Sequence, residues 1–219
     1  EWLNLKEIMW SKNCVISPKR FINYVQKISL IKGYDLFSGF AQNDLPEFLN
    51  FIINCFHNSI KREVKMNIVG NVINDKDYLA KECYNMIKNM YEKEYSELLD
   101  YFFGTHVSYI ESLENKNIIS CSCEPFCNLS LPIPEKSLEC SIYDCLNLYT
   151  NKELLSGENS YFNEKTNSYE DVFKCLNFWS LPKILIVDFK RFIKNNKKKQ
   201  TLITTPIENL DLTNYIIGY

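Results

Sequence analysis

The chain has 219 residues, of which 46% are hydrophobic and 14% aromatic, so it can bury a core and is expected to be globular. Its net charge of −2 gives no electrostatic reason to expect nucleic acid or an anionic membrane as a partner. Nine irregularly spaced cysteines without a hydrophobic leader indicate reduced thiols in a cytoplasmic or nuclear protein, and no apolar run is long enough to cross a bilayer.

The first half of the chain shows helical spacing of apolar residues. The segment "SPKRFINYVQKI" predicts a helix with Ser17 as the N-cap and Pro18 at its first position. A second helix is predicted in "NDLPEFLNFIINCFHNSI", where Asn43 and Asp44 are capping candidates. A third, longer helix is expected over about residues 77–102 and is ended by Gly104. Its expected inner face is Leu79, Cys83, Met86, Met90, Tyr91, Leu98 and Phe102.

The second half changes to strand-like patterns. Residues 116–131 and 182–192 are rich in β-branched and aromatic residues with alternation, which predicts strands. Between them, "SLECSIYDCLNLYT" predicts a short helix with Ser137 as its cap. Helices followed by a sheet with one inserted helix indicate an α+β fold.

Six blocks in the sequence carry a more specific signal. They are "LKEIMWSKNCVISPKRFINYV", "FSGFAQNDLPEFL", "CEPFCNLSLPIP", "YDCLNLYTNKELLSGENSY", "LPKILIVDFKRF" and "TPIENLDLTNY". In this order the blocks resemble the ubiquitin-specific protease family of deubiquitinases over nearly the whole chain. The resemblance implies a papain-like cysteine peptidase fold of fingers, palm and thumb that grips ubiquitin and cleaves after its C-terminal Gly-Gly.

The resemblance also implies a domain organisation. We expect residues 1–219 to be a single, incomplete catalytic domain, with helical thumb elements in 1–104 and antiparallel finger and palm strands in 105–219. The family's nucleophile lies in a "GNTCYxNS" box and its base in a "GHY" box, and this sequence contains neither. The segment alone is therefore predicted to be inactive, with no catalytic residue of its own.

Three residues are catalytic candidates by residue type, and we predict that none of them is catalytic. Cys14 lies in "SKNCVISP" without the nucleophile context, so we interpret it as an ordinary thiol. His57 ends the second predicted helix and His106 follows the Gly104 break, and neither matches a family histidine. We predict structural or solvated roles for both, because a general base needs a positioned partner.

The box around residues 42–47 is the predicted binding site. The ubiquitin tail carries two arginines, and carboxylates on a helix N-terminal turn can accept charge-assisted bonds from guanidinium groups. Asp44 and Glu47 are three residues apart and match the family's tail-binding carboxylates, and Gln42 would add a polar contact. The alternative is a capping box with Asp44 as N-cap and Glu47 at N3. Asn43 and Pro46 depart from the family pattern here.

Metal ligands are the second departure from the family. Many members hold zinc between two CxxC pairs at the finger tips. The corresponding positions in this chain are Glu111, Glu114, Asn163 and Thr166, so we expect no zinc and no other cofactor. A substitute site could be imagined from Cys121, Cys123, Cys127 and Cys140, but we favour buried free thiols.

The basic run Lys194–Lys199 is interpreted as a solvated hairpin loop, since no aromatic residue is interleaved there for base stacking.

The sequence leaves three hypotheses for the function of the chain. The first is an interior segment of an active deubiquitinase, whose nucleophile and base lie outside it. The second is a catalytically inactive ubiquitin-binding pseudoprotease or scaffold, and the third is an unrelated α+β interaction module. We favour the first, with ubiquitin or a ubiquitinated protein as partner.

Overall fold

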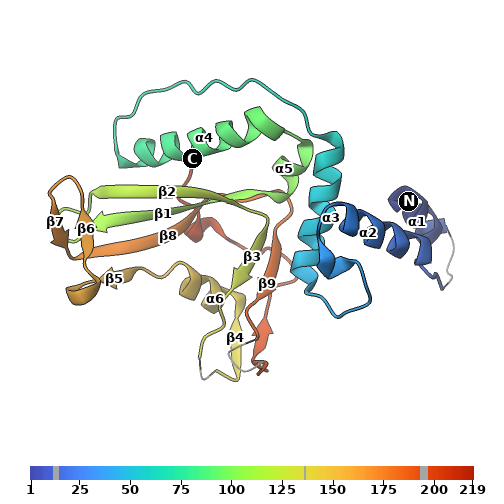
Figure 1. Cartoon of the computed structure of the whole chain (residues 1–219). Helices are drawn as coiled ribbons and strands as arrows, with labels where there is room; N and C mark the ends of the chain where they lie inside the picture. Colours follow the sequence, from blue (N-terminus) through green and yellow to red (C-terminus); the bar gives the residue numbers. More distant parts are fainter. Residues whose placement is uncertain (12–14, 136, 193–196) are drawn as a thin grey trace. The chain divides into compact units, whose positions relative to one another are not determined.

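The computed structural model describes residues 1–11, 15–135, 137–192 and 197–219 (Figure 1). The helices are α1 (Trp2–Ser11), α2 (Lys19–Ile31), α3 (Leu45–Ile60), α4 (Asp75–Glu94), α5 (Glu97–Phe102) and α6 (Ile142–Tyr149). The strands are β1 (Gly104–Ser112), β2 (Ile118–Phe126), β3 (Asn128–Leu131), β4 (Glu139–Ser141), β5 (Glu153–Leu155), β6 (Tyr161–Asn163), β7 (Ser168–Glu170), β8 (Val172–Ser180), β9 (Ile186–Phe189) and β10 (Leu202–Thr204). Helices α1–α5 precede the strands and α6 is inserted between β4 and β5, so the predicted α+β class is confirmed. No helix in the described ranges combines the length and the apolar character needed to span a membrane.

The chain divides into two compact units, Glu1–Ile52 and Ile53–Tyr219. In the first unit, the buried ring of Phe37 packs against Phe48 and Phe51 at centroid distances of 5.5 and 5.0 Å. The predicted helix start is wrong by one residue, because Pro18 and not Ser17 occupies the N-cap of α2. Proline has no N–H to leave unsatisfied there, so the helix begins at Lys19.

The long helix predicted over 77–102 is in fact two helices. Tyr95 has extended dihedral angles, and its N–H and C=O pair with the C=O and N–H of Arg62 at 2.9 Å. Ser96 then takes the N-cap position of α5. Because the register shifts at this break, Leu99 becomes the buried residue of α5 where the unbroken pattern had predicted Leu98.

A four-stranded antiparallel sheet in the order β2-β1-β8-β5 forms the centre of the second unit (Figure 1). The expected strand segments contain β2, β3 and β9, but β1 and β8 were not predicted. Alternating side chains of β1 face two different cores. Val107 packs with Leu79 and Cys83 of α4, and the ring of His106 contacts Phe178, which belongs to the core that also contains α6.

Three two-stranded pairs complete the second unit. The pair β6–β7 is antiparallel, and the pairs β3–β9 and β4–β10 are parallel. Helix α6 is capped by Ser141 and not by Ser137, because the residues before it form β4. The Ser141 hydroxyl accepts from Asp144 N, and the Asp144 carboxylate accepts from Ser141 N, which is a full capping box.

Candidate functional site

The predicted tail-binding residues lie at the start of α3. Gln42 and Asp44 belong to the segment before the helix, Glu47 lies in its first turn, and all three are exposed. The Asp44 carbonyl accepts from Phe48 N at 3.1 Å, which places Asp44 at the N-cap position. The side chain of Asn43 donates to the carbonyl of Ala41 at 3.1 Å and shapes the turn that precedes the helix.

The carboxylates of Asp44 and Glu47 are unused inside the protein. Across the described ranges, neither takes part in a hydrogen bond or an ion pair, so the reciprocal side-chain bonds of a capping box do not form at α3. Helix α4 shows the contrast, because Asn74 and Asp77 make both bonds of a capping box. Two unpaired carboxylates near each other on one exposed helix end are available for an external cation.

An apolar hollow of about 330 Å³ adjoins Asp44 within the first unit. Its wall includes Phe21, Ile22, Val25, Phe37, Leu45 and Phe48. The side chain of Gln26 also lines it and donates to the Gly39 carbonyl at 3.0 Å, which fixes the loop above α2. The hollow can take an aliphatic side chain next to the carboxylate.

The three predicted residues are not gathered in one cavity. Gln42 lines a neighbouring hollow with Tyr34, Leu36 and Phe40, and Asn43 lines both hollows. Glu47 lines neither of these two. The arrangement is an open surface around the N-terminus of α3, which suits an extended peptide better than an enclosed small molecule.

His57 is part of a helix joint. Its side chain is almost fully buried, its Nδ1 lies 2.7 Å from Ser96 Oγ, and its Nε2 lies 3.6 Å from Glu94. Although Ser, His and Glu could suggest a nucleophilic triad, Ser96 is fully buried at the N-cap of α5 and cannot meet a substrate. The contact therefore links the end of α3 to the break between α4 and α5.

His106 lies in the core beneath the sheet. Its ring stacks on Phe126 at a centroid distance of 4.2 Å, and its Nε2 lies 3.1 Å from the Tyr149 hydroxyl. Burial lowers the pKa of His106 from 6.5 to about 4. The imidazole is thus neutral at physiological pH and packs as an aromatic ring.

We expect the folded state to lose about 2 kcal/mol of stability between pH 6.5 and 4 because of His106. In that window the unfolded chain binds the proton and the folded chain does not, so stability falls as the pH falls. Denaturant titrations of the wild type and of His106→Phe across this range test the effect. The variant should show a shallower pH dependence, and equal slopes for both proteins would refute the assignment.

The cysteines do not assemble the alternative metal site. Cys140 lies in the core around α6, where its Sγ is 3.9 Å from Cys145 Sγ, whereas Cys121 and Cys123 pack beneath α4. Cys127 is buried. Within the ranges that the structure describes, no cluster of three or more His, Cys, Asp or Glu side chains is arranged to hold a metal. Cys14 lies outside the described residues.

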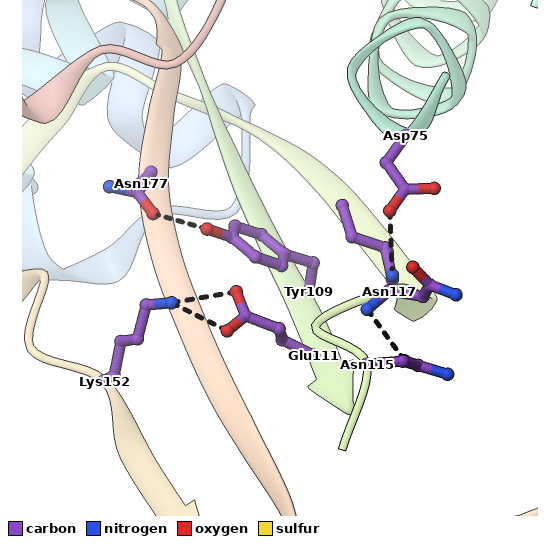
Figure 2. Close-up of polar contacts among 8 residues, drawn as sticks. Asp75, Tyr109, Glu111, Asn115, Asn117, Lys152 and Asn177 are labelled. Carbon is purple, nitrogen blue, oxygen red and sulfur yellow. Dashed lines mark hydrogen bonds and ion pairs between the residues drawn. The ribbon is translucent and has the colours of Figure 1, made fainter. Parts of the chain in front are cut away.

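On β1, the side chain of Glu111 already has a partner within the protein. Lys152 Nζ contacts its two carboxylate oxygens at 3.0 and 2.8 Å (Figure 2). On the same strand face, the Tyr109 hydroxyl donates to Asn177 at 3.3 Å. Asn115 Oδ1 accepts from Asn117 N in the turn that follows β1 (Figure 2).

The other three aligned positions, Glu114, Asn163 and Thr166, line one hollow of about 720 Å³. Asn163 donates to both oxygens of Glu170 at 3.1 Å, and the hydroxyl of Thr166 also donates to Glu170. Sequence reasoning missed Glu170, because no family motif marks it.

These residues do not fit zinc. Structural zinc sites use thiolate and imidazole ligands, and here a carboxylate pairs with an ammonium while an amide and a hydroxyl donate to a second carboxylate. The hydrogen bonds from Thr166, Asn163 and Ser168 lower the pKa of Glu170, so it is ionised at neutral pH. Glu170 stabilises the turn between β6 and β7 by accepting hydrogen bonds from Asn163 and Thr166.

Replacing Glu170 by Gln should loosen the β6–β7 hairpin, because an amide is a weaker acceptor than a carboxylate for three donors. Amide hydrogen exchange over residues 161–170 should accelerate severalfold. Glu164→Gln is the matched control, since Glu164 is exposed on the same turn. Identical exchange in the two variants would show that Glu170 does not hold the hairpin.

The basic run is described only from Lys197 onward. Phe192 and Lys198 form an antiparallel bridge, and Lys199 Nζ donates to the Ile133 carbonyl at 2.8 Å. Residues 193–196 lie outside the described residues. The flanking bridge is consistent with the predicted hairpin.

Comparison with known proteins places this arrangement in a family. The sequence model described as "Ubiquitin carboxyl-terminal hydrolase" matches residues 2–218. Ubiquitin carboxyl-terminal hydrolase 2 of Gallus gallus is 29% identical over 98% of this chain and 60% of its own length. The Homo sapiens protein of the same name is also 29% identical, over 98% of this chain and 36% of its own length. The chain thus spans at most three fifths of these relatives.

A solved structure supports the same placement. The SAGA DUB module (Ubp8, Sgf11, Sus1 and Sgf73) bound to monoubiquitin contains a chain that matches with a TM-score of 0.62. The two are 26% identical, and the match covers 88% of this chain and 38% of that one. By sequence and by fold, this chain belongs to the ubiquitin carboxyl-terminal hydrolase family, as a member of the ubiquitin-specific protease type of deubiquitinase.

Proposed function

We propose that this chain is the ubiquitin-binding segment of a cysteine deubiquitinase that hydrolyses the peptide or isopeptide bond after the C-terminal Gly-Gly of ubiquitin. Family membership over residues 2–218 supports the reaction class, and the related SAGA module was solved with monoubiquitin bound. The observation that carries the assignment of the site is the pair of unpartnered carboxylates, Asp44 and Glu47, at the exposed N-terminus of α3.

In this proposal the tail lies in an extended form across the start of α3. Asp44 and Glu47 accept charge-assisted bonds from the tail arginines, while the apolar hollow beside Asp44 takes an aliphatic side chain. Gln42 adds a polar contact from the preceding segment. Several anchoring points along one extended peptide fix its register, so that the bond after Gly-Gly is presented at a constant place.

The bond-breaking step needs a thiolate, a histidine that takes and returns its proton, and a group that orients the histidine. This sequence contains neither the "NTCY" nor the "GHY" box, so these groups would come from other parts of the complete protein. We expect the protein in the cytoplasm or nucleus, where thiol chemistry is compatible with its free cysteines.

A ubiquitin probe with a thiol-reactive C-terminus tests the activity. The complete protein should form a covalent adduct with the probe through a cysteine outside this segment, and the 219-residue chain alone should bind ubiquitin without forming an adduct. A second candidate is a ubiquitin-binding pseudoprotease, which would bind ubiquitin without turnover. Binding by the complete protein without an adduct would select that candidate over the first.

A further inference from the structure

Two cysteine side chains from different elements meet beneath α4. Cys83 lies in the middle of α4 and is fully buried, and Cys123 lies on β2 and is partly exposed. Their Sγ atoms are 2.9 Å apart, although the residues are 40 positions apart in the sequence. Helix α4 runs along the sheet over β2, so the contact is between two packed elements and not within a flexible loop (Figure 1).

The separation is shorter than an ordinary van der Waals contact between two sulfur atoms. A disulfide has its sulfur atoms about 2.05 Å apart, so bond formation needs an approach of about 0.9 Å beyond the 2.9 Å observed. A shift of this size is within the reach of side-chain rotation and small helix adjustment. The thiols of Cys140 and Cys145, at 3.9 Å, provide an internal comparison with a longer separation.

We propose that Cys83 and Cys123 are a reversible disulfide pair that ties α4 to β2 under oxidising conditions, with hydrogen peroxide as the oxidant. In the first step, the Cys123 thiol loses its proton to solvent and the thiolate attacks one peroxide oxygen. The O–O bond breaks, Cys123 sulfenic acid forms, and the departing hydroxide takes up a proton from solvent to give water. In the second step, the Cys83 sulfur attacks the Cys123 sulfur, and the sulfenic hydroxyl leaves as water with the Cys83 proton. Two thiols and one peroxide thus give one disulfide and two waters.

Exposure sets the order of these steps. Cys123 is partly exposed and can meet peroxide first, while the fully buried Cys83 is protected from solvent and acts as the resolving thiol. Cys121 lies two residues along β2 and packs against the same helix, so it is the competing partner. The Sγ contact at 2.9 Å favours Cys83 with Cys123.

The surroundings keep the pair reduced at rest. Interaction with Cys121 acts to lower the pKa of Cys123, but the contact with Cys83 and burial outweigh it and raise the pKa to about 12. Interaction with Cys123, together with burial, raises the pKa of Cys121 as well. Because the thiolate is the reactive form, oxidation is slow at neutral pH and accelerates as the pH rises. We therefore expect the disulfide to form only when the oxidant is present for a prolonged time.

Closing the bond would join segments separated by α5 and β1. A cross-link over such a span restricts the unfolded chain, so the oxidised protein should be more resistant to unfolding. It would also limit opening of α4 from the sheet, because the bond fixes the middle of the helix. The expected readouts are a higher melting temperature and slower amide exchange in α4.

Peptide mapping by mass spectrometry tests the proposal on the whole chain. The folded protein is treated with hydrogen peroxide near pH 8, remaining thiols are blocked with N-ethylmaleimide, and the protein is digested. We expect a cross-linked peptide joining Cys83 and Cys123, lighter by two hydrogen atoms than the two reduced peptides, and lost after dithiothreitol. Cys121→Ser should retain this product and Cys123→Ser should abolish it.

Two results would overturn the proposal. One is the absence of the Cys83–Cys123 peptide from wild-type protein whose circular dichroism shows that it stayed folded through the treatment. The other is preferential cross-linking of Cys121, or of Cys140 with Cys145, under the same conditions. The wild-type result is decisive by itself, so a folding defect in either serine variant would not remove the test.

Discussion

Changing Asp44 to Asn and Glu47 to Gln together is expected to weaken ubiquitin binding by about 100-fold, because each substitution removes the charge from a charge-assisted hydrogen bond. Both side chains are exposed and unpartnered within the described residues, so the substitutions should leave folding unchanged. Calorimetric titration of each variant with monoubiquitin measures the effect. Gln42→Ala should cause a smaller loss, since it removes one neutral contact.

The matched control is Glu7→Gln with Glu63→Gln. These two carboxylates are also exposed, and their removal changes the net charge by the same amount. If binding depended only on the overall charge of the protein, both double variants would weaken it equally. An unchanged affinity in the Asp44 and Glu47 variant would show that the tail is held elsewhere.

Replacing Phe178 by Ala is expected to destabilise the fold by about 3–5 kcal/mol. Phe178 is fully buried on β8, and its ring lies 5.5 Å from His106, 5.6 Å from Phe126 and 5.9 Å from Tyr149 between centroids. The substitution leaves a cavity where β1, β2 and α6 pack against β8. Since natural domains have a total stability of about 5–15 kcal/mol, most of the folded state could be lost.

Phe162→Ala provides the control for this prediction. Phe162 lies on β6 with 42% of its surface exposed, and its main ring contact is Tyr169 at 5.2 Å. Its loss should cost less than about 1.5 kcal/mol. Denaturant unfolding of the two variants measures both values. Similar costs at the two positions would contradict the assignment of Phe178 to the centre of the core.

The sequence predicts elements well where periodicity and local capping agree. Helices α2 and α3 have apolar residues at helical spacing and were located to within a few residues. The break at Tyr95 and Ser96 was missed because it depends on Arg62 and His57, which are distant in the sequence. Strand β8 was missed because it is covered on both faces, so that buried positions do not alternate simply.

The candidate site shows the same contrast between features that depend on neighbouring residues and features that depend on contacts between distant segments. Gln42, Asp44 and Glu47 could be proposed from one short block because they are close in the sequence, and their role in binding stays a prediction. The roles of Glu170 and of the Cys83–Cys123 contact could not be predicted, because each depends on a three-dimensional meeting of separate segments. The assignment of Glu111, Glu114, Asn163 and Thr166 to the family's zinc positions stays a prediction.

The most direct test of the central claim compares two ligands for the 219-residue chain. Monoubiquitin with its complete C-terminal tail and ubiquitin lacking the tail segment that carries the arginines and Gly-Gly are titrated under identical conditions by calorimetry. We predict measurable binding of the first and at least about 100-fold weaker binding of the second, since both arginine contacts and the rest of the tail are lost. Equal affinity for both ligands would contradict the assignment of the α3 N-terminus as the tail site.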